Sequence, residues 1–145
     1  MIRIETRPAR PFDAGAMAAI VERLARPALS VAPYLRNWLA EGDLWFLAEI
    51  GTEIVGFQWA GRAASRPDTC EIATFVPTGR NDLAIGSSLF QATLEAARNR
   101  GFRWIEARLP AANGGAFIYY RSRGFEERPG HRTSATDQTI LFYRL

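Results

Sequence analysis

The stretch 70–109 constrains the fold more than any other part of this sequence, because it holds a helix pattern between two strand patterns. Residues 70–77 (CEIATFVP) and 103–109 (RWIEARL) are short, apolar runs typical of strands. The helix pattern at 87–100 has its apolar residues on one face: Leu89, Phe90, Leu94 and Ala97. A strand, a helix and a strand in this order predict two parallel strands joined by a right-handed crossover.

Strand and helix patterns continue on both sides of this unit. The other predicted strands are 2–6, 44–50, 54–62, 125–129 and 138–145. The other predicted helices are 12–26, 34–42 and 114–123. Asp13 can cap the first of these helices, which Pro27 ends, and the C-capping glycines are Gly42, Gly101 and Gly124. The short gap between strands 44–50 and 54–62 predicts an antiparallel hairpin.

These elements predict a mixed α/β fold, in which helices cover the faces of one sheet. The sheet should be mostly antiparallel, with the parallel pair in 70–109, and about four helices should flank it. A length of 145 residues fits a single domain over 1–145.

Composition narrows the classes of partner. The net charge is +3, but all 18 basic residues are arginines, scattered from Arg3 to Arg144. A nucleic-acid site would concentrate them on one face, so no nucleic-acid partner is expected, and only a weak attraction for a small anion remains. A single cysteine, Cys70, favours a reducing cytoplasm. There is neither a signal-peptide pattern nor an apolar run of ~20 residues, so no membrane partner is expected.

The segment 76–90 is a candidate anion site. A strand ends there, a polar loop follows, and a helix is expected to start near Gly86. Backbone N–H groups at a helix start attract anions, and the small residues allow a phosphate to approach them: Ala84, Gly86, Ser87 and Ser88. Many folds contain such a connection without any ligand, so the pattern alone leaves both interpretations open.

The segment 113–125 carries two adjacent tyrosines with different surroundings. Asn113 can cap the helix at 114–123, and Tyr120 lies two turns further on the same face, with Ala116 between them. Tyr119 is rotated by about 100°, so the two tyrosines cannot do the same job. The alternative is that both pack and that Asn113 only caps the helix.

Glu71 is the acid of the strand 70–77. An acid in the middle of a sheet can serve as a general base. Strand alternation puts its side chain opposite those of Cys70 and Ile72, so it can equally be a solvent-facing residue.

The two segments together resemble the GNAT superfamily of acyl-CoA-dependent N-acetyltransferases. That family's C-terminal signature matches five residues here: Asn113, Ala116, Tyr120, Gly124 and Phe125. The order of elements is similar over nearly the whole chain. The family's cofactor motif usually has Gln or Arg, two residues, Gly, one residue, and Gly or Ala. Here Asn81, Ala84 and Gly86 hold those places, so the first two depart from the motif.

The resemblance implies a binding mode and roles for individual residues. Acetyl-CoA would lie in a V-shaped gap between the strand ending at Val76 and the strand 103–109, which would be a splayed parallel pair. The cofactor-binding residues would be Phe75, Val76, Asn81, Asp82, Leu83, Ala84, Ile85, Gly86, Ser87, Asn113 and Tyr120. Backbone groups near Phe75 would pair with the pantetheine amides, and N–H groups from 82 to 87 would hold the pyrophosphate. Tyr120 would protonate the departing thiolate, and Glu71 would deprotonate the amine.

The resemblance also bounds the acceptor and the partners. It implies a small-molecule or peptide primary amine, no metal, and a homodimer as one arrangement. The residues that could line the acceptor site are aromatic, apart from one histidine: Tyr34, Trp38, Trp45, Phe46, Trp59 and His131. The aromatic residues among them could equally be core, and His131 could be an incidental loop residue. The alternative function is a non-catalytic acyl-CoA-binding or regulatory domain.

Overall fold

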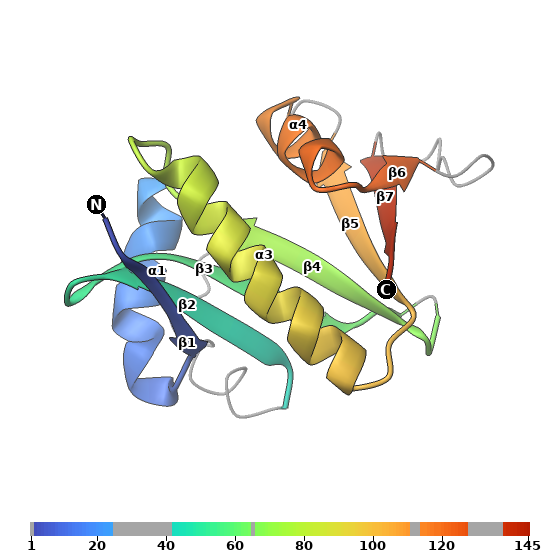
Figure 1. Ribbon diagram of the computed structural model, residues 1–145, viewed down its shortest axis with the longest axis horizontal. Coiled ribbons are helices and arrows are strands. Elements are labelled where there is room, and N and C mark those ends of the chain that lie inside the picture. The colour runs from blue at the N-terminus through green and yellow to red at the C-terminus, as the bar shows by residue number, and fades with distance from the viewer. Residues whose placement is uncertain (1, 25–41, 65, 111–113, 128–137) are drawn as a thin grey trace. The chain divides into compact units, whose positions relative to one another are not determined.

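The computed structural model describes residues 2–24, 42–64, 66–110, 114–127 and 138–145 (Figure 1). Its strands are β1 (Ile4–Pro8), β2 (Leu44–Ile50), β3 (Glu53–Arg62), β4 (Thr69–Phe75), β5 (Trp104–Pro110), β6 (Glu126–Glu127) and β7 (Gln138–Arg144). Its helices are η1, a 3-10 turn (Pro11–Asp13), α1 (Ala14–Arg23), α3 (Asp82–Asn99) and α4 (Gly114–Ser122). The predicted helix at 34–42 lies outside the described residues.

The seven strands form one sheet in the order β1-β2-β3-β4-β5-β7-β6. β4 and β5 run parallel, as the strand–helix–strand pattern predicts. The pairs β1–β2, β2–β3, β5–β7 and β6–β7 are antiparallel. The predicted α/β class with one parallel pair in a mixed sheet is therefore confirmed.

The chain forms two compact units, and each is described by itself. The first unit comprises Met1–Ala60 and Ala73–Ala96, and the second comprises Gly61–Ile72 and Ala97–Leu145. β4 therefore contributes Ala73–Phe75 to the first unit and its earlier residues to the second.

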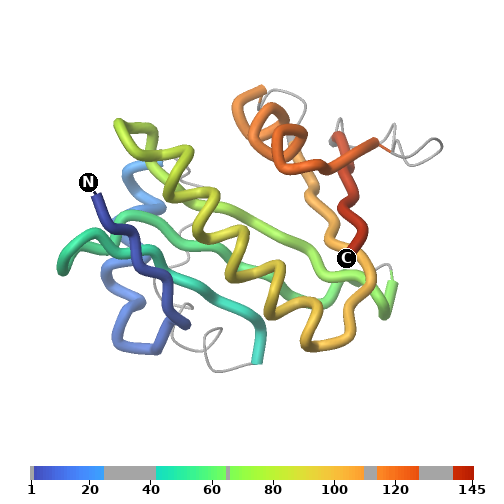
Figure 2. The backbone as a smooth tube through the Cα atoms, in the orientation of Figure 1, coloured from blue at the N-terminus to red at the C-terminus, as the bar shows by residue number. Residues whose placement is uncertain are grey.

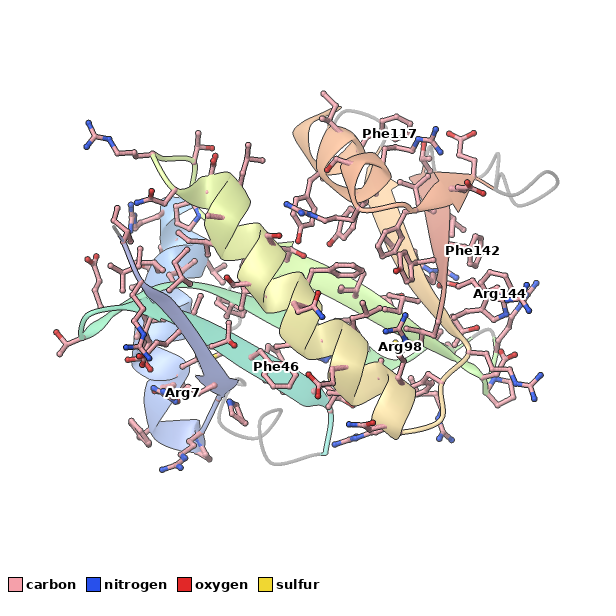
Figure 3. The ribbon with its side chains drawn as sticks, in the orientation of Figure 1. Arg7, Phe46, Arg98, Phe117, Phe142 and Arg144 are labelled. Atoms are coloured by element: carbon pink, nitrogen blue, oxygen red, sulfur yellow. The ribbon has the colours of Figure 1, made fainter. Side chains whose placement is uncertain are left out.

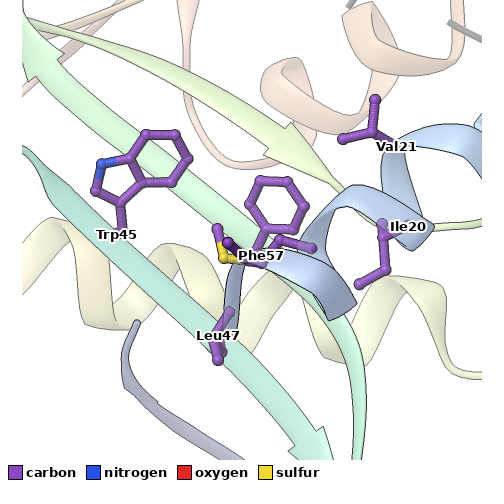
Figure 4. Close-up of a cluster of buried hydrophobic side chains, with 7 residues drawn as sticks. Ile20, Val21, Trp45, Leu47 and Phe57 are labelled. Carbon is purple, nitrogen blue, oxygen red and sulfur yellow. The ribbon is translucent and has the colours of Figure 1, made fainter. Parts of the chain in front are cut away.

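In the first unit, α1 and α3 cover opposite faces of the strands. Met17, Ile20 and Val21 of α1 are buried with Trp45, Leu47 and Phe57 of β2 and β3 (Figure 4). On the other face, Ile85 and Leu89 of α3 pack against Ala48. Leu47 and Ala48 are neighbours in β2, and alternation along a strand sends their side chains to opposite faces.

The second unit is built on β5, which pairs with β4 on one side and β7 on the other. Gly101 and Gly124 end α3 and α4 with φ of +83° and +102°, as predicted for C-caps. The same pair of backbone hydrogen bonds closes both helix ends. At α4, the Phe125 N–H donates to Tyr120 O (3.1 Å) and the Gly124 N–H to Arg121 O (3.1 Å).

In the part of the chain that the structure describes, no helix is long and apolar enough to span a bilayer.

The prediction that Asp13 caps α1 with its side chain is wrong. Asp13 occupies the N-cap position, but its carboxylate makes no cap hydrogen bond. Both oxygens point back to Arg7 in β1 (2.9 Å each), and one also accepts the Arg10 N–H (2.8 Å). Figure 3 labels Arg7, the cation that competes for this carboxylate.

Candidate active site

The start of α3 differs from the prediction. The helix begins at Asp82, not near Gly86, and the Ile85 N–H already donates to Asn81 O (2.9 Å). The N–H groups ahead of this ladder are those of Asp82, Leu83 and Ala84, of which the first donates to Gly79 O (3.4 Å) and the second to the Asp82 carboxylate (2.8 Å). Ile85, Gly86 and Ser87 lie further inside the helix, where backbone N–H groups ordinarily form helical bonds, and their role as pyrophosphate donors stays a prediction. The small residues looked like a loop, but Ile85 and Leu89 give α3 a buried stripe that extends the helix.

The first turn of α3 is nevertheless suited to an anion. Leu83 and Ala84 are exposed, and the positive end of the helix dipole lies there. Asp82 is half-buried, and one oxygen of its carboxylate accepts the Leu83 N–H (2.8 Å). The chain runs from β4 into this turn within a few residues (Figure 2).

Gly56 in β3 lets the end of β4 approach α3. A Cβ at residue 56 would lie 3.0 Å from Val76 Cγ2, 3.1 Å from Ile85 Cγ2 and 3.3 Å from Phe75 O. These distances are shorter than ordinary van der Waals contact, so a side chain here would push its neighbours by a few tenths of an ångström, and glycine permits the close packing. Phe75 is the last residue of β4, and its ring stacks on Phe57 with centroids 4.6 Å apart. The segment predicted to pair with pantetheine thus packs close to the first turns of α3.

Tyr120 is the more deeply buried of the two tyrosines. It is 3% exposed and packs edge to face against Phe125, with ring centroids 5.1 Å apart. Tyr119 is half-buried, makes a T-shaped contact with Tyr120 (4.9 Å), and lies beneath the guanidinium of Arg123 (5.1 Å). The two rings therefore have different surroundings, as predicted, although both pack. Asn113 lies outside the described residues, so its shared face with Tyr120 stays a prediction.

Glu71 is a half-buried member of a charged cluster. The flanking residues Cys70 and Ile72 are buried, as alternation predicts. One Glu71 oxygen lies 3.4 Å from Arg108 Nε, and its side chain is 34% exposed. Burial raises the pKa of Glu71 above its ordinary value, the positive charge of Arg108 opposes that rise, and the negative charge of Glu106 adds to it. A carboxylate with a raised pKa is a better proton acceptor than an ordinary surface acid.

Sequence reasoning missed Glu106 and Arg108, the two partners of Glu71. Glu106 is buried in β5 directly opposite Glu71, and Arg108 Nε donates to Glu106 Oε1 at 2.6 Å. The available signal was their spacing: an acid and an arginine two residues apart in one apolar strand share a face.

Tyr120 and Glu71 lie on opposite faces of the second unit's sheet. Tyr120 reaches the sheet through Phe125, which contacts Tyr143 (5.3 Å), and Tyr143 is the register partner of Ile105. Ile105 and Glu106 are adjacent in β5, so their side chains point to opposite faces. The carboxylates therefore occupy the face that the Tyr120 stack does not.

The aromatic residues considered for the acceptor site have different surroundings in the structure. Trp45 is core, Phe46 packs on the α3 side, and the Trp59 indole N–H donates to Asp43 (3.0 Å). Tyr34, Trp38 and His131 lie outside the described residues. Among those described, Trp59 is half-buried and lies within 6.3 Å of Trp45, centroid to centroid.

Comparisons with known proteins agree with this fold and this order of elements. Residues 16–125 match the model of the Acetyltransferase (GNAT) family. An uncharacterised N-acetyltransferase of Methanocaldococcus jannaschii is 31% identical over 100 residues, which cover 63% of this chain but only 44% of that protein. The chain therefore spans less than half the length of this relative.

Two solved structures have the same fold. An acetyltransferase of the GNAT family from Staphylococcus aureus Mu50 superposes with a TM-score of 0.81 at 18% identity, covering 99% of both chains. The yncA protein of Salmonella typhimurium, solved with its cofactor acetyl-CoA, has a TM-score of 0.79 at 18% identity, covering 98% of this chain and 94% of that one. With 110 of its residues in the family match, the chain belongs to the GNAT family of acetyltransferases.

Proposed function

We propose that this protein is an N-acetyltransferase that moves the acetyl group of acetyl-CoA to a primary amine by direct attack. The observation that carries the proposal is the arrangement in the second unit: a buried phenol, Tyr120, on one face of the sheet, and a carboxylate with a raised pKa, Glu71, on the other. Such a pair provides a proton donor and a proton acceptor, the two kinds of group that acetyl transfer to an amine uses. Family membership supports the acetyl-CoA part of the proposal.

The residues of the first unit fit acetyl-CoA. The first turn of α3 offers the positive end of the helix dipole and the small, exposed Ala84, which suit a pyrophosphate. The end of β4 at Phe75 and Val76 would pair with the pantetheine amides as an added strand does. Asn113 would bind the same arm. Acetyl-CoA, when bound, supplies the thioester whose carbonyl carbon accepts the new bond.

Each chemical role follows from ordinary acid–base chemistry. The amine nitrogen forms a bond to the acetyl carbon, the carbon–sulfur bond breaks, and the sulfur leaves as a thiolate. A phenol with a pKa near ~10 keeps its proton at neutral pH and can give it to that thiolate, which is the role of Tyr120. Glu71 takes the proton that the amine loses, directly or through water. The acceptor would be a small-molecule or peptide amine.

Two measurements test the proposal. Acetyl-CoA that binds only the folded state should raise the melting temperature, by a stabilisation of about RT ln(1 + [L]/Kd). Adding a panel of primary amines should then release free thiol at a rate that depends on the amine. Stabilisation without thiol release from any amine would favour a non-catalytic acyl-CoA-binding domain, an alternative that the departures at Asn81 and Ala84 favour. An unchanged melting temperature at saturating acetyl-CoA would refute both functions.

A further inference from the structure

The two carboxylates of the second unit share a single guanidinium. Glu71 and Glu106 stand directly opposite each other in the parallel β4–β5 register, and Arg108 is two residues further along β5 on the same face. Like charges directly across a sheet repel one another. Arg108 lies within 4 Å of both acids, so its positive charge offsets their repulsion.

The guanidinium of Arg108 lies closer to Glu106 than to Glu71. Arg108 Nε is 2.6 Å from Glu106 Oε1 and 3.4 Å from Glu71 Oε1. The Nε atom carries one hydrogen, and only the contact to Glu106 is a hydrogen bond. Glu106 is 3% exposed, so its charge needs that partner, whereas Glu71 is 34% exposed and keeps contact with solvent. With two negative charges and one positive charge, Glu71 is the carboxylate left without full compensation.

Among the described residues, the charges that shift the pKa of Glu71 are those of Arg108 and Glu106. On β7, apolar Phe142 and Ile140 stand opposite Glu106 and Arg108. Arg144 stands opposite Trp104, near the other end of β5 (Figure 3). At the end of β3, the guanidinium of Arg62 lies over the Phe102 ring (6.0 Å). Glu106 and Arg108 therefore govern the charge on Glu71.

We propose that Arg108 is a positioning residue that compensates Glu106 first, so that Glu71 is the carboxylate that receives the proton of the acceptor amine. This inference rests on the proposed function, because the proton comes from that reaction. The raised pKa of Glu71, caused first by burial, agrees with it. Arg108 acts only through the two acids, and it need not touch the acceptor or acetyl-CoA.

The inference predicts shifts of opposite sign at Glu71. Glu106→Gln removes a negative neighbour and leaves Arg108 to Glu71, so the titration midpoint of Glu71 should fall by roughly one pH unit. Arg108→Gln removes the positive neighbour, so the midpoint should rise by a similar amount. Arg108→Lys keeps the charge and should return the midpoint most of the way. A change in packing alone does not reverse sign between two such variants.

The experiment is a titration of the full chain labelled with 13C at the glutamate carboxyls, followed by NMR, with Glu71→Gln to assign the signal. The matched control is Arg144→Gln, which removes an exposed arginine from the same unit and should move the midpoint little. Where Arg108→Gln does not fold, the double variant Glu106→Gln/Arg108→Gln removes the deeply buried acid together with its partner. Its midpoint should lie above that of Glu106→Gln alone.

The acid limb of kcat/KM against pH, measured in parallel, should move with the NMR midpoints. Shifts of the same sign in Glu106→Gln and Arg108→Gln, or no shifts, would overturn the inference even in an active enzyme. Opposite NMR shifts in a protein that transfers no acetyl group would support the charge arrangement and sink the proposed function instead.

Discussion

Arg7 holds Asp13 through two parallel hydrogen bonds, Nη1 to Oδ2 and Nη2 to Oδ1, each 2.9 Å long. This contact ties β1 to the turn that precedes α1. Asp13 is 2% exposed, and Arg7 also pairs with Glu49 in β2. Ion pairs therefore stabilise the edge of the first unit's sheet, in addition to its apolar core.

Asp13→Asn should destabilise the protein by about 2–4 kcal/mol, because it leaves Arg7 without its main partner at a largely buried site. The measurement is chemical denaturation at pH 7. Glu5→Gln is a suitable control, since Glu5 belongs to an exposed ion pair on the same strand and should cost less than about 1 kcal/mol. Equal losses in the two variants would contradict a special role for the Arg7–Asp13 pair.

The same pair predicts a pH dependence. The hydrogen bond from Arg7 holds the pKa of Asp13 below its ordinary value. A lowered folded-state pKa gives stability that is present above the unfolded value and is lost as the pH falls through the folded value. The stability gap between the parent and Asp13→Asn should therefore be constant near neutrality and shrink below about pH 4. A gap that does not change with pH would show that Asp13 contributes by packing alone.

Gly56→Ala should disturb the junction between β4 and α3. The new Cβ would meet two methyl groups and the carbonyl of Phe75, which as backbone cannot move aside cheaply. We expect a loss of about 1–3 kcal/mol in stability and weaker acetyl-CoA binding. Gly15→Ala is the matched control, because nothing lies within 4 Å of its added Cβ and alanine favours the helix α1. Both quantities can be measured by denaturation and calorimetric titration.

Much of the fold was predictable from the sequence, and particular residues show why. Gly101 and Gly124 marked helix ends correctly because a positive φ is a local requirement. Asp13 was misassigned because the cap is a local pattern, whereas Arg7 reaches it from another element. The start of α3 was missed because Ile85 gains its burial from residues distant in sequence, among them Ala48 of β2 and Val55 of β3.

The candidate site divides in the same way. Tyr120 and Glu71 became candidates through the family resemblance along the chain, and their roles stay predictions. Glu106 and Arg108 did not become candidates, because their importance comes from the register that puts β5 beside β4. Strand pairing of this kind depends on the folded sheet, and a single sequence does not specify the register between distant strands.

Ala84→Glu should separate binding from stability. The residue is exposed in the first turn of α3, where an acid interacts favourably with the helix dipole, so stability should stay equal or rise by up to about 1 kcal/mol. The added charge should repel the pyrophosphate and weaken acetyl-CoA binding roughly tenfold. Ala84→Gln is the neutral control of similar size. If the glutamate and glutamine variants bind acetyl-CoA equally well, the phosphates lie away from this turn.

Tyr120→Phe tests the chemistry directly. The substitution removes one oxygen and keeps the ring that packs edge to face on Phe125 and Tyr119, so the fold should persist. Losing a general acid typically costs 10²–10⁴-fold, but water can substitute in part, so kcat should fall at least about tenfold. Acetyl-CoA affinity should barely change, because the proton is given only as charge develops on sulfur.

Tyr119→Phe is the control for this variant, since it also removes one phenol oxygen from α4 and leaves an aromatic ring beneath Arg123. It should keep most of the parent's kcat with an accepted amine. The two variants make the same chemical change at neighbouring positions of α4. They differ only in which hydroxyl is lost. Equal losses of activity, or full activity in Tyr120→Phe, would mean that Tyr120 is a packing residue and that another group, or water, protonates the thiolate.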